Sequence, residues 1–467
     1  MTALDTLLKN DTSRNIFLKG LNGSGPAMTI ASLFTKGRGS YVCVLNDQEE
    51  AGYFYHDLMQ LTASNEVYFF PSAYRRAIKY GHVDPANEIL RTEVLSRLQD
   101  PDASFVIVTY PDALAERVVA REVLKENTLK ISVGEKLDNM FVSDVLDEYG
   151  FEQVDYVYEP GQYALRGSIL DVFSFSNEFP YRIDFFGDEV DSIRRFNISS
   201  QLSADKLDRV EIIPNLNAGD GAAKVSFVQF AGDAAAYWFY DADYVLRRVN
   251  DIRRKTLADM ERPEEIDRLM TSRNALLGDL ANCRMLALRD NLPERPATAA
   301  VEFDTAPQPK FNKNFEMLAD DMIRNSLRGY TTYILSENKV QVERLENIFH
   351  QIGRGQAVVR PLSVTLHEGF VDNDLKLCLY TDHQIFDRYQ RYRINGEIRR
   401  DEQMTVAELN QLRPGDYVVH IDHGVGRFDG LVKINENGKA HEAIKLVYKD
   451  GDVLFVNVHS LHRISRY

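Results

Sequence analysis

Residues 15–27, NIFLKGLNGSGPA, decide the fold of the first part of the chain. The apolar run NIFLKG at 15–20 predicts a buried strand, and GLNGSGPA at 20–27 predicts a glycine-rich turn that leads into a helix. Proline suits the first turn of a helix, because its missing N–H is one that the helix would leave unpaired. We therefore predict a strand–turn–helix unit at this point.

Three further apolar runs follow before residue 120: YVCVLND at 41–47, VYFFPS at 67–72 and FVIVTY at 105–110. The segments between them have the spacing of amphipathic helices. Continuous apolar strands that alternate with helices are typical of a parallel sheet covered on both faces. The first 120 residues therefore predict an α/β domain with a parallel sheet.

The glycine-rich turn has the spacing of a nucleotide-binding phosphate loop, with Gly20 and Gly25 as its two glycines. Pro26 replaces the lysine that would reach the phosphates, and Ala27 replaces the hydroxyl residue that would bind Mg²⁺. We predict a degenerate loop without ATP hydrolysis, and we assign no catalytic residue. The alternative is an ordinary turn that never had this function.

The sequence DEVD at 188–191 resembles the acidic motif of helicases. That motif needs a buried apolar strand running directly into its first aspartate, and Gly187 interrupts such a run here. We interpret the segment as a hairpin turn.

The remainder of the chain predicts a multidomain α/β and α+β protein. An α+β insertion is expected at 121–205, which has short strands and turns. Residues 206–305 have a mixed pattern, with a strand VEIIPN and long charged helices between Asp241 and Cys283. The further expected parts are a second small α/β domain at 311–390, a polar linker at 391–408 and a small β-barrel at 409–467. Two-residue hairpins are expected at Asn437-Gly438 and Asp450-Gly451.

Composition favours protein partners over nucleic acid. The net charge of −15 over 467 residues opposes a DNA-binding body, because such proteins neutralise phosphates with Lys and Arg. The basic stretch at 246–255 is interpreted as a solvated helix face. Three cysteines far apart indicate a reducing cytoplasm and no structural zinc. We expect no signal peptide and no membrane association.

Two segments resemble known families. RGSILDVFSF at 166–175 and FPYRIDFFGDEVDSIRRFN at 179–197 resemble the UvrA-binding insertion shared by UvrB and the bacterial transcription-repair coupling factors. LRPGDYVVHIDHGVGRFDGLVKI at 412–434, with LFVNVHSLHRISRY at 454–467, resembles the polymerase-interacting domain that coupling factors share with CarD-type regulators. HEGFVDNDLKLCLYTDHQIF at 367–386 also resembles the coupling factors. The order of the first two signatures on one chain is the specific part of the resemblance.

The resemblance implies a function and a fold. It makes 1–120 and 206–305 a UvrB-like degenerate phosphate-loop domain and the barrel SH3- or Tudor-like. It implies an adaptor that binds the β subunit of RNA polymerase and recruits UvrA to lesions in nucleotide excision repair. The family's translocase motor, with its ATP, Mg²⁺ and double-stranded DNA, is expected after residue 467 and thus outside this chain. We expect no cofactor in these residues.

The resemblance places the UvrA contacts at Arg166, Arg182 and Phe186. Strand alternation puts Ile183 and Phe185 toward the core and leaves Arg182 and Phe186 on the other face. A phenylalanine beside arginines on an exposed face has the composition of an interaction hot spot. The alternatives are that Phe186 is a core residue under a helix, and that the arginines form surface ion pairs with Asp184 or Asp188.

The resemblance places the polymerase contacts on one barrel strand at Leu431, Lys433 and Ile434, where a partner could add a strand. The alternative is that Leu431 or Ile434 fills the barrel, since alternate positions point inward. His420 and His423 have metal-like spacing, but no cysteine or carboxylate set accompanies them. We therefore predict a turn at the end of the barrel and no metal site.

Two other functions remain open. One is a UvrB-type, ATP-dependent damage-recognition protein, which an intact lysine at position 26 would have favoured. The other is a stand-alone CarD-type regulator, which leaves the first 300 residues without a role.

Overall fold

The structure is a computed structural model of the 467-residue chain. The residues it describes are 2–9, 14–37, 39–62, 66–74, 84–177, 179–198, 201–216, 222–233, 235–260, 262–388, 412–420, 423–436, 439–448, 451–457 and 464–466. The predicted linker at 391–408 and the Asn437-Gly438 turn lie outside these ranges. Contacts divide the chain into one unit of Met1–Thr128 with Asn215–Tyr392 and another of Leu129–Pro214 with Arg393–Tyr467.

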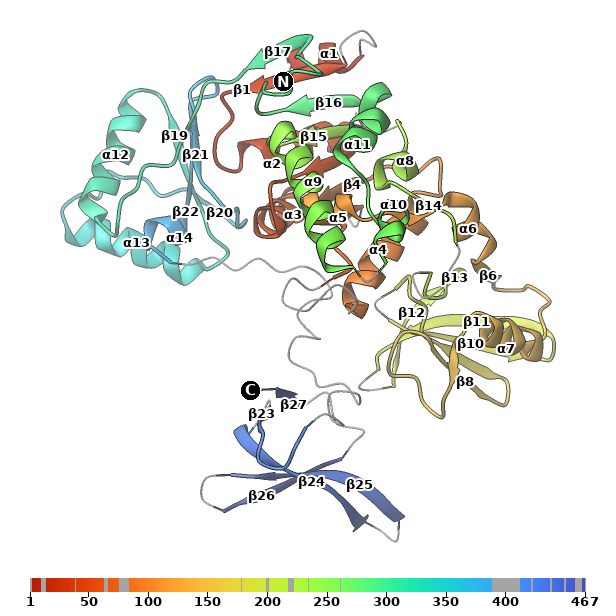
Figure 1. The fold of residues 1–467 in the computed structure, drawn as a ribbon. Helices are drawn as coiled ribbons and strands as arrows, with labels where there is room; N and C mark the ends of the chain where they lie inside the picture. The colour runs from red at the N-terminus through yellow and green to blue at the C-terminus, as the bar shows by residue number, and fades with distance from the viewer. Residues whose placement is uncertain are drawn as a thin grey trace. The chain divides into compact units, whose positions relative to one another are not determined.

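A seven-stranded parallel sheet forms the centre of the first unit (Figure 1). Its order is β17-β1-β16-β15-β2-β4-β3, so β1 lies between two strands, β17 and β16, from the later part of the chain. The strands are β1 (Asn15–Lys19), β2 (Ser40–Val44), β3 (Val67–Phe69), β4 (Val106–Thr109), β15 (Ala235–Phe239), β16 (Arg284–Ala287) and β17 (Ala299–Glu302). The predicted parallel sheet is confirmed, because the four apolar runs before residue 120 all supply strands to it.

The helices of this sheet include α2 (Gly25–Thr35), α3 (Gln48–Thr62), α4 (Pro85–Arg97), α5 (Pro111–Ala115) and α9 (Ala242–Asp259). Each strand of the inner pair β2 and β4 is buried along nearly its whole length. Trp238 of β15 is fully buried and stacks on Phe54 of α3, with ring centroids 4.9 Å apart. This burial on both faces explains why the strands are continuously apolar in sequence.

A second, smaller α/β body follows at residues 305–385. Its sheet has the order β18-β21-β22-β19-β20 and mixes parallel with antiparallel pairs. The elements are β18 (Thr305–Pro307), α12 (Phe315–Leu327), β19 (Thr331–Leu335), α13 (Lys339–Gln351), β20 (Pro361–Leu362), β21 (Phe370–Asp372), β22 (Leu377–Thr381) and α14 (Asp382–Ile385). Strand β20 has only two residues and begins at Pro361, which cannot donate a ladder hydrogen bond.

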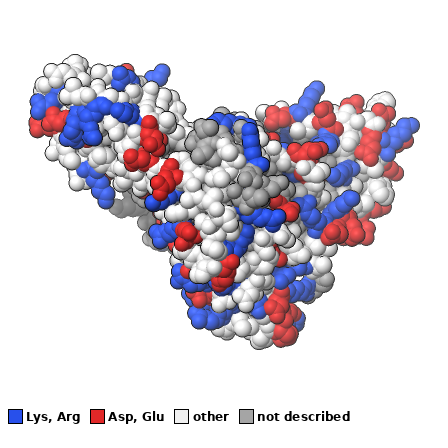
Figure 2. All heavy atoms as spheres, turned by 90° about the horizontal axis from the view of Figure 1, so that it is seen from above, with Lys and Arg blue, Asp and Glu red and all other residues white. Residues whose placement is uncertain are grey.

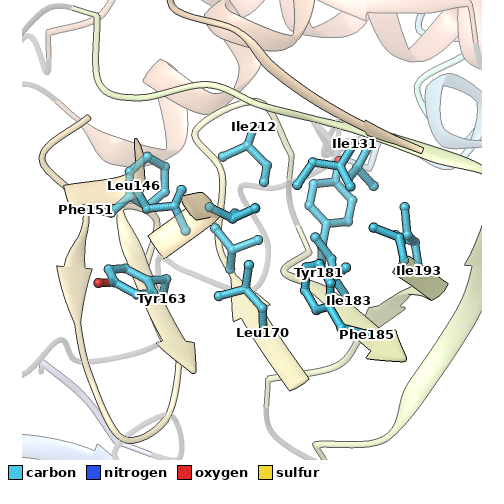
Figure 3. Close-up of a cluster of buried hydrophobic side chains, with 14 residues drawn as sticks. Ile131, Leu146, Phe151, Tyr163, Leu170, Tyr181, Ile183, Phe185, Ile193 and Ile212 are labelled. Carbon is cyan, nitrogen blue, oxygen red and sulfur yellow. The ribbon is translucent and has the colours of Figure 1, made fainter. Parts of the chain in front are cut away.

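The insertion contains a six-stranded sheet of order β12-β11-β10-β9-β8-β7. Its elements are α7 (Asn139–Glu148), β7 (Glu152–Gln153), β8 (Gln162–Arg166), β9 (Ile169–Val172), β10 (Tyr181–Phe186), β11 (Glu189–Phe196) and β12 (Ser203–Leu207), beside a ribbon of β6 (Leu129–Ser132) and β13 (Arg209–Ile212). Figure 3 shows the buried cluster between α7 and the sheet, with Leu146, Ile183 and Phe185 among its members. The turn between β10 and β11 at Gly187 (φ +66°) confirms the hairpin predicted for DEVD.

The C-terminal residues form a five-stranded antiparallel sheet of order β26-β25-β24-β23-β27. Its strands are β23 (Tyr417–His420), β24 (Gly424–Glu436), β25 (Lys439–Val447), β26 (Val453–Asn457) and β27 (Ile464–Arg466). An antiparallel sheet is thus present where the sequence predicted a small barrel. The closed SH3-like barrel is not confirmed, since no pairing between β26 and β27 closes the sheet in the described residues.

Candidate interaction surfaces

Strand β10 of the insertion presents two different faces because its side chains alternate. Ile183 and Phe185 are buried in the core cluster against α7. Arg182 and Phe186 lie on the opposite face, as the alternation predicted. The strand is fixed in place by antiparallel pairing with β9 on one side and β11 on the other.

Phe186 is the last residue of β10. Its side chain is 83% exposed, more than any other aromatic side chain among the described residues. Gly187 follows it with φ +66°, which turns the chain into β11. The alternative in which Phe186 is a core residue under a helix is therefore wrong. A ring this exposed contributes little to the domain's own stability, so its apolar surface is available to a partner.

Arg182 lies opposite Asp171 on the neighbouring strand β9. Its Nε donates to Asp171 Oδ1 at 2.7 Å and its Nη2 donates to Oδ2 at 2.8 Å. Arg166 of β8 donates to the same Oδ2. The Asp171 side chain is completely buried, so two guanidinium groups share one buried carboxylate.

Both arginines also rest on aromatic rings. The Arg182 guanidinium lies 4.4 Å from the centre of the Phe196 ring, and that of Arg166 lies 5.1 Å from the centre of Tyr156. Hydrogen bonding to Asp171 raises the pKa of Arg182, although burial acts in the other direction. The two groups are thus held in fixed positions with one positive charge in excess of the carboxylate. Arg182 also donates to Gln201, and Arg166 also donates to the backbone oxygen of Asp155, which holds both guanidinium groups further in place.

The carboxylate partner was not identified from the sequence. The alternative that the arginines pair with Asp184 or Asp188 is wrong, because the ion pairs of Arg166 and Arg182 are with Asp171. Asp184 instead pairs with Arg194 and accepts a hydrogen bond from Ser192. Asp171 sits inside the apolar run ILDV, where a buried charge requires a partner. The place of Asp171 within an apolar strand was therefore the feature of the sequence that could have predicted its pairing with an arginine.

Strand β24 of the C-terminal sheet is paired unevenly along its two edges. β25 pairs with it from Arg427 to Glu436, with a bulge between Phe428 and Leu431. In the described residues β23 pairs only with Gly424–Arg427. The second half of β24 therefore has one edge on which no described strand is paired.

The predicted polymerase-contacting residues lie on this second half of β24. Leu431 is opposite Ile444 and is 45% exposed, so it does not fill the core of the sheet. The backbones of Lys433 and Ile434 pair with Glu442 and His441. Their side chains lie outside what the structure describes.

The two histidines near the start of β24 lie close together. The ring centroids of His420 and His423 are 4.8 Å apart, and His420 is buried. Among the described residues no group of three His, Cys, Asp or Glu side chains is arranged to hold a metal ion. Cys43, Cys283 and Cys378 are buried free thiols.

The glycine-rich turn lies between β1 and α2, as the sequence predicted for the strand–turn–helix. Gly20 has φ +88° and ends the strand, while Gly25, Pro26 and Ala27 form the buried first turn of α2. Proline at this position fits the start of a helix. No described helix of the chain is long and apolar enough to cross a membrane.

Two family models match the chain. A UvrB interaction domain matches residues 129–217, which contain Arg166, Arg182 and Phe186. A CarD-like/TRCF RID domain matches residues 412–467, which contain the second half of β24.

The chain is also similar to curated proteins over nearly its whole length. It is 24% identical over 517 residues to the transcription-repair-coupling factor of Escherichia coli (strain K12), which covers 96% of this chain and 44% of the relative. For the factor of Staphylococcus aureus (strain NCTC 8325 / PS 47) the identity is 23% over 556 residues, covering 100% of this chain and 47% of the relative. The chain thus spans a little under half the length of these relatives. The two domain models match in this order along the chain, and over nearly its whole length the chain is similar to proteins named transcription-repair-coupling factors.

Proposed function

We propose that this chain is the adaptor part of a transcription-repair coupling factor, which binds UvrA through the insertion domain. The observation that carries the proposal is Phe186, 83% exposed at the end of β10 beside the arginines held by Asp171. Arg182 and Phe186 are four residues apart on the same face of one strand, about 13 Å, so one partner surface can contact both. An aromatic ring beside fixed cations is the composition that interfaces concentrate at their centre.

The second partner of the adaptor is the β subunit of RNA polymerase, bound through β24. The CarD-like/TRCF RID match and the half-paired edge of β24 support this assignment. Backbone hydrogen bonds from an added strand would supply affinity, and Leu431, Lys433 and Ile434 would supply specificity. The two partners lie on separate domains, so one chain can hold both and bring UvrA to a stalled polymerase.

The catalytic work of the pathway belongs, in this proposal, to the family's translocase motor. That motor would use ATP and Mg²⁺ and would act on double-stranded DNA. On the face shown in Figure 2, Lys and Arg side chains are interspersed with Asp and Glu. Such a mixed surface suits protein contacts better than it suits a DNA backbone. We place the adaptor in the cytoplasm, where its free thiols would stay reduced.

A UvrB-type, ATP-dependent damage-recognition protein is the alternative. Pro26 and Ala27 argue against it, since neither can reach a phosphate or coordinate Mg²⁺. Mg²⁺-dependent ATP turnover by the purified chain would favour this alternative over the adaptor.

The proposal is tested by titrating the chain separately with UvrA and with the polymerase β subunit. We expect both to bind, Phe186→Ala to weaken only UvrA, and Leu431→Arg to weaken only the β subunit. Binding of the β subunit without UvrA would instead indicate a CarD-type regulator. Binding of neither would refute the adaptor function.

A further inference from the structure

The glycine-rich turn between β1 and α2 is in contact with a distant segment of the same chain. Ser24 N donates to Glu368 O at 3.0 Å, and Glu368 N donates to Ser24 Oγ at 3.0 Å. The two residues are 344 positions apart in sequence. The turn is therefore bridged to residues 367–370, which lead into β21 of the small α/β body.

The approach of this segment requires the glycine at position 23. A Cβ on Gly23, which has φ +54°, would lie 2.7 Å from Gly369 O and 3.1 Å from Glu368 O. At the other end of the turn, a Cβ on Gly20 would lie 2.1 Å from Phe303 O. Both glycines thus make room for carbonyl oxygens of this chain.

A phosphate group needs the opposite arrangement. In a phosphate loop, free backbone N–H groups point at the bound phosphate, and glycines leave room for that anion to approach the backbone. Here the Ser24 N–H is already bonded to a carbonyl, and the Gly369 carbonyl oxygen lies against Gly23. Carbonyl oxygens carry partial negative charge and would repel a phosphate. The residues present therefore do not fit a nucleoside triphosphate.

Residues 367–370 are anchored from both sides of the contact. His367 N donates to Asp57 Oδ1 of α3 at 2.7 Å, and the His367 ring stacks on Tyr53 with centroids 3.7 Å apart. From the small body, His383 Nε2 donates to His367 O at 2.8 Å, and Gln384 Oε1 accepts from Gly369 N at 2.8 Å. The segment is thus anchored to both α/β bodies at the place where it meets the turn.

Apolar packing adds to these hydrogen bonds. Leu366 and Phe370 are buried, and they belong to a cluster that packs against Met28 of α2 and Leu61 of α3. The contact joins the two α/β bodies through both polar and apolar groups.

We propose that residues 367–370 are a built-in occupant of the degenerate phosphate loop. The turn serves as a joint between the two α/β bodies, and it is closed to nucleoside triphosphates by backbone oxygens as well as by the loss of its lysine. This inference stands apart from the adaptor function, because it concerns neither the β10 surface nor β24.

Hydrogen exchange of the full chain tests the joint, with Gly23→Ala as the probe and Gly37→Ala as its control. Gly37 also has positive φ (+66°), but nothing lies within 4 Å of a Cβ built there. Both variants carry the backbone strain, and only Gly23→Ala collides with residues 368–369. We expect Gly23→Ala to lower the protection of peptides 20–27 and 366–370 together, by about tenfold or more, and Gly37→Ala to leave both unchanged. Loss of protection at 20–27 alone would overturn the joint.

Restoring the missing side chains tests the occupant. The double variant Pro26→Lys and Ala27→Thr regains both chemical groups of a phosphate loop. We expect millimolar Mg-ATP to leave its melting temperature unchanged, because the carbonyl oxygens remain in place. A rise in melting temperature with Mg-ATP, absent with Mg²⁺ alone, would show that the turn is open and overturn the proposal.

If the Gly23→Ala variant does not fold, the His367→Ala variant serves as the probe in the same hydrogen-exchange experiment. This change removes the stack on Tyr53 and leaves every glycine of the turn intact. We expect faster exchange at both 366–370 and 20–27 in the folded variant. Faster exchange at 366–370 with unchanged protection at 20–27 would show that the two segments are not joined.

Discussion

Arg182 and Asp171 face each other across β9 and β10 and form a two-pronged ion pair, with Nε–Oδ1 at 2.7 Å and Nη2–Oδ2 at 2.8 Å. The carboxylate is fully buried, whereas the arginine side chain is 17% exposed. The pair therefore lies at the boundary between the core of the insertion and its outer face. The pair fixes the orientation of the Arg182 guanidinium, and so fixes which part of it is exposed to solvent.

Asp171→Asn tests the structural side of this pair. The change keeps the shape of the side chain but removes the negative charge that two arginines share. We expect the free energy of unfolding of the insertion to fall by about 2 kcal/mol. The loss is smaller than for a completely buried pair, because both arginines still contact water. Urea unfolding measures the loss. Asp184→Asn is the matched control, since its pair with Arg194 is more exposed and should cost under about 1 kcal/mol. Equal losses would contradict this view of Asp171.

Phe186→Ala separates binding from folding. The ring is 83% exposed, so its removal should change the free energy of unfolding by no more than about 0.5 kcal/mol. If the ring is a central anchor for UvrA, the complex should weaken by about 2 kcal/mol, measured by titration. Phe141→Ala is the control, because Phe141 is also exposed (54%) but belongs to α7, which packs on the core face of the sheet. A similar effect of both variants would remove Phe186 from the site.

The parallel sheet was predictable because its strands are buried on both faces and so are apolar throughout, as in VIVT of β4. The exposure of Phe186 was predictable from the period of two in YRIDFF. In both cases the information lies within one short segment of sequence.

The features that were missed depend on which strands become neighbours. Asp171 meets Arg182 only because β9 and β10 pair in one register. The contact of Ser24 with Glu368 uses backbone groups, which every residue has, so no side-chain pattern marks it. Closure of the C-terminal sheet depends on its two edge strands, whose separate patterns carry no information about whether they meet.

Leu431→Arg tests the polymerase surface on β24. Because Leu431 is 45% exposed, the sheet should remain folded, and binding of the β subunit should weaken by about 2 kcal/mol if the residue is buried in the complex. Ile434→Arg is expected to have a similar effect. Phe428→Ala gives the contrast, since Phe428 is in the core of the sheet and its loss should unfold the sheet. Circular dichroism of each variant decides between folding and binding. Normal binding by folded Leu431→Arg and Ile434→Arg proteins would place the interface elsewhere.

His383 gives the joint between the two α/β bodies a predicted dependence on pH. Burial lowers the pKa of His383 below its ordinary value of 6.5, although the hydrogen bond to His367 O and the nearby Asp382 act in the other direction. As the pH falls through 6.5, the unfolded chain takes up a proton that the folded chain resists, so stability is lost toward acid. The effect is absent at higher pH, where the ring is neutral in both states. His383→Gln keeps an N–H donor near the Nε2 position and removes the titration. We expect the parent to lose more stability than His383→Gln between about pH 8 and about pH 5.5, with exchange at 366–370 rising in the parent alone. Parallel curves for the two proteins would show that His383 does not control this contact.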